Sequence, residues 1–85
     1  MENENKIKQI TRYRGHHCNI DLKNGDVVEG ILAYYNLNEQ MIHLNRFKTI
    51  TSEGSVTKTE RGELMVINKC AWLTIKIDGE VIKNE

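Results

Sequence analysis

The pattern that most constrains this chain is an alternation of apolar and polar residues over 16–23, followed by Asn24-Gly25 and a long apolar segment over 26–36. A period of two is typical of a half-buried β-strand. Asn-Gly is the strongest short signal for a β-hairpin, because both residues tolerate a positive φ. Gly30 interrupts the second segment, and a glycine inside a strand usually marks a bulge or a bend. The sequence therefore predicts a hairpin with one sharply bent strand.

The downstream sequence predicts more strands of the same sheet. Three further segments are apolar enough to form strands: 41–47, 63–67 and 70–77. Residues 49–62 are rich in Thr, Ser, Gly and charge, and predict a variable, mobile loop. Asp78-Gly79 is a second hairpin dipeptide, after which residues 80–83 would fold back as a short strand.

A short helix is expected before the first strand. Ile7 and Ile10 have the i, i+3 spacing of a thin apolar stripe, which predicts a helix over 5–13 that docks on the sheet. Gly15 follows as a typical residue at a helix C-terminus. Residues 1–4 are expected to be disordered.

A helix followed by five strands predicts a mainly β fold, a small five-stranded, strongly bent antiparallel barrel of the SH3-like kind, because closure removes sheet edges. The 85 residues leave room for one domain over 5–78, with 79–85 as a short C-terminal extension or strand stub. A core of this size supplies about 3–5 kcal/mol, so we expect subunit association to supplement it.

Composition excludes several classes of function. Twelve basic and twelve acidic residues give a net charge of zero, which argues against binding a polyanion through bulk charge. The acidic N-terminus is unlike a signal peptide, and no apolar run is long enough for a membrane span. Two cysteines suit a reduced cytosol, and we expect a cytoplasmic protein without a membrane partner.

The sequence predicts neither catalysis nor a metal or other cofactor. It has no Gly-rich phosphate loop, no nucleophile elbow and no paired carboxylates at a telling spacing. Of the adjacent residues His16, His17 and Cys18, only the first and third share a strand face, and Cys18 belongs to the core pattern. Cys70 fits a small buried cysteine in a strand better than a nucleophile.

Two parts of the chain carry a family resemblance. The helix, then Leu-Lys-Asn-Gly at 22–25, then Gly30 and Tyr35-Asn36, resembles the first motif of the Sm and Sm-like (LSm) family. Residues 64–75 resemble its second motif, and the resemblance covers about 5–77. It implies an Sm-like barrel in which the fourth strand of one subunit pairs with the fifth of the next, forming a homo-oligomeric ring.

The resemblance also implies that two turns of each subunit bind single-stranded, U- or A-rich RNA around a central pore. The polar residues at these turns are Asn36, Asn38, Gln40, Asn68 and Lys69. Amide side chains can donate and accept at a base edge, and one lysine per subunit becomes a ring of charge. Asparagine also favours turns for backbone reasons, so reader and turn former both remain open.

Other residues are candidates for accessory contacts. Tyr13, between Arg12 and Arg14, has two open interpretations, stacking on an RNA base or half-buried packing. The alternation over 70–77 puts Leu73, Ile75 and Ile77 on one face, and Trp72, Thr74 and Lys76 on the other. We expect four residues at a subunit interface: Met65, Ile67, Trp72 and Thr74.

Departures from the Sm pattern support a second hypothesis. Glu39 stands where a stacking residue is expected, and Asn68-Lys69 replaces Arg-Gly. The first turn is one residue longer, as in the LSm domains of decapping enhancers, which implies a monomeric or dimeric module that docks short peptide motifs. Separately, Lys-Cys-Ala at 69–71 resembles the Lys-His-Ala of bacterial Hfq. If residues 80–83 fold back, they occupy the edge that a ring needs.

Overall fold

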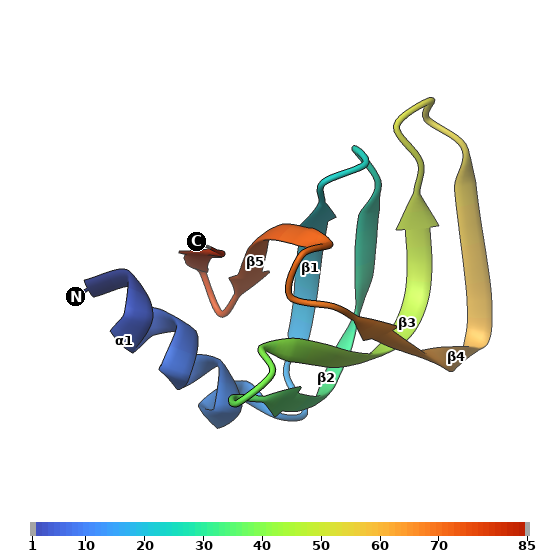
Figure 1. The fold of residues 1–85 in the computed structure, drawn as a ribbon. Coiled ribbons are helices and arrows are strands. Elements are labelled where there is room, and N and C mark those ends of the chain that lie inside the picture. Colours follow the sequence, from blue (N-terminus) through green and yellow to red (C-terminus); the bar gives the residue numbers. More distant parts are fainter. Residues whose placement is uncertain (1, 85) are drawn as a thin grey trace.

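The structure is a computed structural model that describes residues 2–84 (Figure 1). The chain begins with helix α1 (Glu2–Gln9), which continues as one 3₁₀ turn over Ile10–Tyr13. Ile7 and Ile10 are both buried, so the predicted apolar stripe is confirmed. The backbone of residues 2–4 forms the first turn of α1, whereas these residues were expected to be disordered. Met1 lies outside the described residues.

Six antiparallel strands follow the helix: β1 (His17–Leu22), β2 (Val27–Asn36), β3 (Met41–Ile50), β4 (Val56–Ile67), β5 (Trp72–Ile77) and β6 (Glu80–Lys83). They form one curved sheet in the order β4-β3-β2-β1-β5-β6 (Figure 1). The mainly β, antiparallel fold with an N-terminal helix is confirmed. The sheet has six strands and not the five expected of the barrel, because residues 80–83, predicted as an extension or strand stub, form β6. Within residues 2–84 the sheet is not closed by pairing, and β4 and β6 are its edges.

Both predicted hairpin dipeptides form turns. At Asn24-Gly25, the side-chain oxygen of Asn24 accepts a hydrogen bond from the N–H of Asp26 at 2.9 Å. Asp78 and Gly79 both have positive φ values, 51° and 78°, which is the geometry of a two-residue type I′ turn. This second turn directs β6 back along β5.

The bend predicted at Gly30 is present. The pairing of β2 with β3 shifts register between Glu29 and Gly30, and again between Leu32 and Tyr34. A Cβ atom at residue 30 would overlap the carbonyl oxygen of Asn45 on β3. Only glycine allows the two backbones to come so close, so the sheet curves here.

The segment 49–62 differs from the loop predicted for it. Strand β3 continues to Ile50 and β4 begins at Val56, so only the residues between them form a turn. Threonine and valine in this segment are β-branched and favour strands, which outweighed the Ser and Gly content on which the prediction relied.

The core lies inside the curved sheet and contains only apolar side chains among the described residues. Helix α1 packs against β6, and Ile7 and Ile82 join the core there. Cys18 is part of this core, and burial raises the pKa of its thiol to about 12. The helix and the last strand therefore complete a core that the first five strands leave open.

One face assignment in β5 is wrong. Trp72 is fully buried and Leu73 is half exposed, the reverse of the prediction. Asp21 pairs with Thr74 but Leu22 pairs with Trp72, so Leu73 is the extra residue of a β-bulge. The bulge inverts the alternation at this end of β5, which turns the indole of Trp72 inward.

Candidate functional site

A hydrogen bond brings together the two turns that the sequence predicted to bind RNA, although its donor lies in the strand that follows the second turn. One turn joins β2 to β3, and the other joins β4 to β5. Trp72, the first residue after the second turn, directs its indole N–H to the carbonyl oxygen of Gln40 in the first turn, at 3.5 Å. The burial of Trp72 therefore ties the end of the second turn to the first.

In the first turn, Asn36 has a structural role. Its side-chain oxygen accepts a hydrogen bond from the N–H of Glu39 at 3.1 Å, which is the behaviour of a turn-forming asparagine. Asn38 is exposed, and Gln40 is half-buried with a positive φ of 54°. Of the three predicted readers in this turn, Asn38 is the one presented fully to solvent.

The second turn is held by a residue that the sequence analysis missed. Asn68 and Lys69 are exposed, and the N–H of Ala71 donates to the carbonyl oxygen of Asn68 at 2.9 Å. Asn84 donates through its side-chain nitrogen to the carbonyl oxygens of Lys69, at 2.5 Å, and Trp72, at 2.9 Å. In the sequence, the one indication that Asn84 could reach this turn is that it follows residues 80–83, which are expected to fold back after Asp78-Gly79.

The accessory residues near the helix lie at the surface beside the core. Arg12 and Arg14 are exposed, and Tyr13 is half-buried and packs against the core. The ring of Tyr13 meets that of His16 edge-on, with centroids 5.6 Å apart. This geometry supports the packing interpretation of Tyr13.

The four predicted interface residues are mostly used inside the chain. Ile67 and Trp72 belong to the core, and Met65 packs against it. Thr74 donates from its hydroxyl to a carboxylate oxygen of Asp21 at 2.7 Å. In this form of the molecule, Ile67 and Trp72 are not available to a neighbouring subunit.

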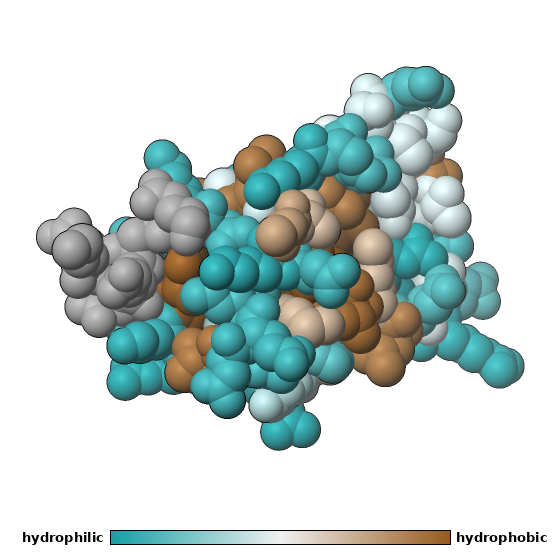
Figure 2. Space-filling view, in the orientation of Figure 1, coloured by the Kyte–Doolittle hydropathy of each residue, from teal (hydrophilic) through white to brown (hydrophobic). Residues whose placement is uncertain are grey.

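One face of the sheet, next to the free edge of β4, carries an apolar patch, which we define as Tyr34, His43, Leu64 and Val66. The first two pair across β2 and β3, and Val66 pairs with His43 across β3 and β4. Tyr34 is 49% exposed, Leu64 67% and Val66 45%. Figure 2 shows apolar surface over the C-terminal part of β4. A contiguous apolar patch beside unpaired main-chain groups is a candidate interaction surface.

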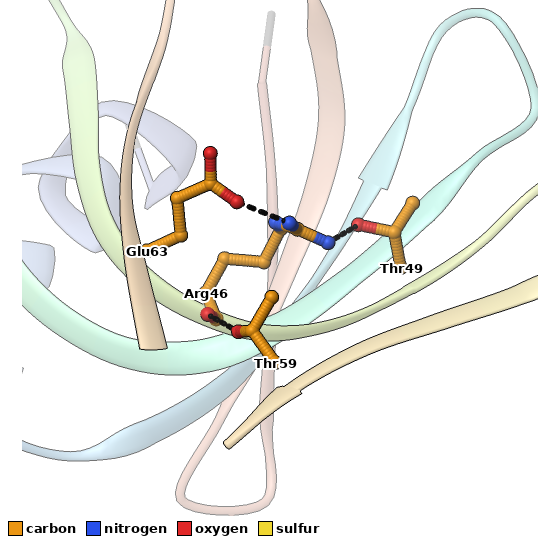
Figure 3. Close-up of polar contacts among 4 residues, drawn as sticks. All are labelled: Arg46, Thr49, Thr59 and Glu63. Carbon is orange, nitrogen blue, oxygen red and sulfur yellow. Dashed lines mark hydrogen bonds and ion pairs between the residues drawn. The ribbon is translucent and has the colours of Figure 1, made fainter. Parts of the chain in front are cut away.

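Polar side chains around Arg46, which we call the arginine cluster, connect β3 and β4 at this edge (Figure 3). Arg46 on β3, with its side chain only 12% exposed, donates to Glu63 Oε2 at 2.6 Å and to the Thr49 hydroxyl at 2.7 Å. The Thr59 hydroxyl donates to the carbonyl oxygen of Arg46 at 3.0 Å. Between these contacts the pairing of β3 with β4 shifts register, so β4 bulges over 59–62. The bulge separates the uncharged end of β4, residues 64–67, from its first residues.

At the other side of the sheet, β6 covers β5. Four residue pairs join them, from Thr74 opposite Lys83 to Ile77 opposite Glu80. Ile82 is 2% exposed, and Asp78 Oδ2 lies 2.8 Å from His16 Nδ1. The edge of β5 that a ring of the Sm type requires is therefore already paired within the chain.

Residues 2–84 contain no cluster of His, Cys, Asp or Glu suited to a metal ion. No helix in that range is both long and apolar enough to span a membrane. No model of a known protein family and no curated protein matches this chain.

Proposed function

We propose that this chain is a small Sm-like barrel module that binds proteins, docking a short extended segment of a partner at the free edge of β4. The curved antiparallel sheet with an N-terminal helix supports the Sm-like assignment. One observation carries the choice of function: β6 is paired with β5, in the place where a second subunit would have to add its fourth strand. With that edge occupied, we expect the chain to act as a monomer.

The docking site is the apolar patch together with the outward main-chain groups of residues 64–67, whose other side is paired with β3. An edge strand binds an extended peptide by adding it to the sheet, so that main-chain hydrogen bonds give affinity and alternate side chains give specificity. Leu64 and Val66 are two residues apart and face the same side, so they would contact alternate side chains of the partner. A fitting partner carries two apolar residues separated by one other.

The test is a selection from a displayed library of random twelve-residue peptides on the full-length chain. The variant Leu64→Lys/Val66→Lys is the matched control, because both substitutions are at exposed positions of the same edge. The proposal expects enriched peptides with an apolar-x-apolar pattern that bind the wild type and lose at least tenfold in affinity on the control. Enrichment of peptides that bind both proteins equally would refute docking at β4.

A second candidate function is single-stranded RNA binding by a ring, and the hydrogen bond from Trp72, next to the second turn, to Gln40 in the first turn favours it. Lys69 is exposed in one turn and Asn38 in the other, so both are open to a nucleotide. A ring of the Sm type needs β6 to leave the edge of β5. Fluorescence anisotropy with labelled oligo-U and oligo-A at two salt concentrations tests this candidate. Lys69→Ala should weaken binding and reduce its salt dependence, and absence of binding to either RNA at low salt would refute it.

A further inference from the structure

The contact between β6 and β5 is short and has little burial of its own. Strand β6 has four residues, of which Ile82 is buried while Glu80, Val81 and Lys83 are exposed. The other side of β5 is paired with β1. Because free energies of local opening are smallest where few apolar groups are buried, β6 is the strand of this sheet best placed to detach without global unfolding.

Polar contacts hold β6 at each end: an exposed pair at its start and a half-buried asparagine at its end. At the start of β6, Asp78 faces His16, and the two side chains are about half exposed. At its end, Asn84 donates from its backbone N–H to the carbonyl oxygen of Leu73 at 2.8 Å, in addition to its two side-chain hydrogen bonds. The half-exposed pair of His16 and Asp78 contributes little, so release of β6 requires the loss of the Asn84 hydrogen bonds and of the Ile82 packing, and of few other contacts.

The same chain carries an edge that can replace β6. Four charged residues lie together on β4 and discourage edge pairing: Lys58, Glu60, Arg61 and Glu63. The following residues 64–67 are uncharged, and their edge is unpaired. A β5 edge on one copy and a β4 edge on another are different surfaces, so their pairing is head-to-tail and can repeat.

We propose that β6 is a removable strap that controls self-association. While β6 is closed, the chain stays in its unassembled form; when β6 opens, residues 64–67 of a second copy pair with β5 in its place. The inference rests on the Sm-like assignment made above, and it requires neither a peptide nor an RNA ligand. It also implies that β6 and a second copy compete for β5, so any condition that favours opening shifts the population toward assembly.

The test uses the full-length variant Asp78→Ala/Asn84→Ala, which removes the side-chain anchors at both ends and keeps Ile82 in the core. The matched control is Lys23→Ala/Glu53→Ala, since both residues are exposed and lie in other turns. Size-exclusion chromatography with light scattering gives the mass at tens of micromolar, and circular dichroism verifies the fold. The proposal expects a single-copy mass for the wild type and the control, and at least a doubled mass for the variant.

A third variant tests whether the β4 edge of a second copy is what pairs with β5. Adding Leu64→Lys and Val66→Lys to the anchor variant should restore the single-copy mass, because charges block the β4 edge. The strap proposal would be overturned by any of three results. These are a folded anchor variant with a single-copy mass, an assembled mass that persists after the two lysines are added, and a wild type that is already assembled.

If the anchor variant does not fold, hydrogen exchange on the wild type decides the question. Amides of 80–83 should exchange at least tenfold faster than those in the pairing of β1 with β2, and equal rates would overturn the strap. None of these readouts depends on a peptide or an RNA, so the strap and the proposed function can fail separately.

Discussion

Replacing Ile82 by alanine measures how strongly β6 is packed. Ile82 is 2% exposed and belongs to the same core cluster as Ile7 on the helix. Truncating a buried isoleucine to alanine costs about 2–5 kcal/mol, because the transfer free energy is lost and a cavity remains. For a domain of this size, about 3 kcal/mol lowers the melting temperature by roughly 12–24 °C. Val81→Ala, at an exposed neighbouring position, should change stability by less than about 0.5 kcal/mol.

Urea unfolding followed by the fluorescence of Trp72 provides the assay, since this is the only tryptophan and it is buried. Ile75→Ala is the sharper comparison, because Ile75 is opposite Ile82 in the register and is also fully buried. The cost of Ile82→Ala cannot exceed the free energy of opening β6, since the variant can simply leave that strand detached. We therefore expect Ile82→Ala to cost less than Ile75→Ala. A cost equal to that of Val81→Ala would refute the packing of β6.

Three further predictions concern the core, the bend and the arginine cluster. Burial raises the pKa of Cys18 to about 12 from 9.0, so its neutral thiol favours the folded state. The free energy of unfolding should therefore decrease as the pH rises from about 9 to 12, and it should decrease less in Cys18→Ala. At neutral pH, an alkylating reagent should label the exposed Cys70 and leave the buried Cys18 unlabelled. Gly30→Ala should destabilise by more than about 3 kcal/mol in urea unfolding, whereas Gly54→Ala, which meets open space but has a positive φ, should cost about 1 kcal/mol. Arg46→Met should lower stability by about 1–3 kcal/mol and increase proteolysis of the hairpin between β3 and β4; an unchanged cleavage rate would contradict its role at the bulge.

Local patterns predicted the elements whose causes are local. The period of two found β1, the dipeptides at 24–25 and 78–79 found both turns, and Gly30 marked the bend. The Trp72 assignment failed because a β-bulge depends on the partner strand, and no spacing within β5 reveals it. The extension of β4 back to Val56 likewise depends on its pairing with β3.

The candidate site shows the same division between local and non-local information. The sequence identified the turns at 36–40 and 68–69 by composition, and both are turns in the structure. It did not identify Asn84, because that residue meets Lys69 and Trp72 only after the chain reverses at Asp78-Gly79. The apolar patch was also missed, since its residues come from three strands and form a surface only through register.

The small core of this chain was expected to need additional stabilisation, and the source of that stabilisation bears on whether the chain assembles. The sequence argued that a chain of this length gains stability from other subunits. In the structure, Ile7 in α1, Ile10 in the 3₁₀ turn and Ile82 in β6 provide additional buried surface from within the chain. A second copy that pairs its β4 with β5 would displace β6 and, with it, Ile82, which is 2% exposed and belongs to the core cluster. Assembly therefore has to compensate for a lost core contact, and this is the physical reason for a closed strap at low concentration.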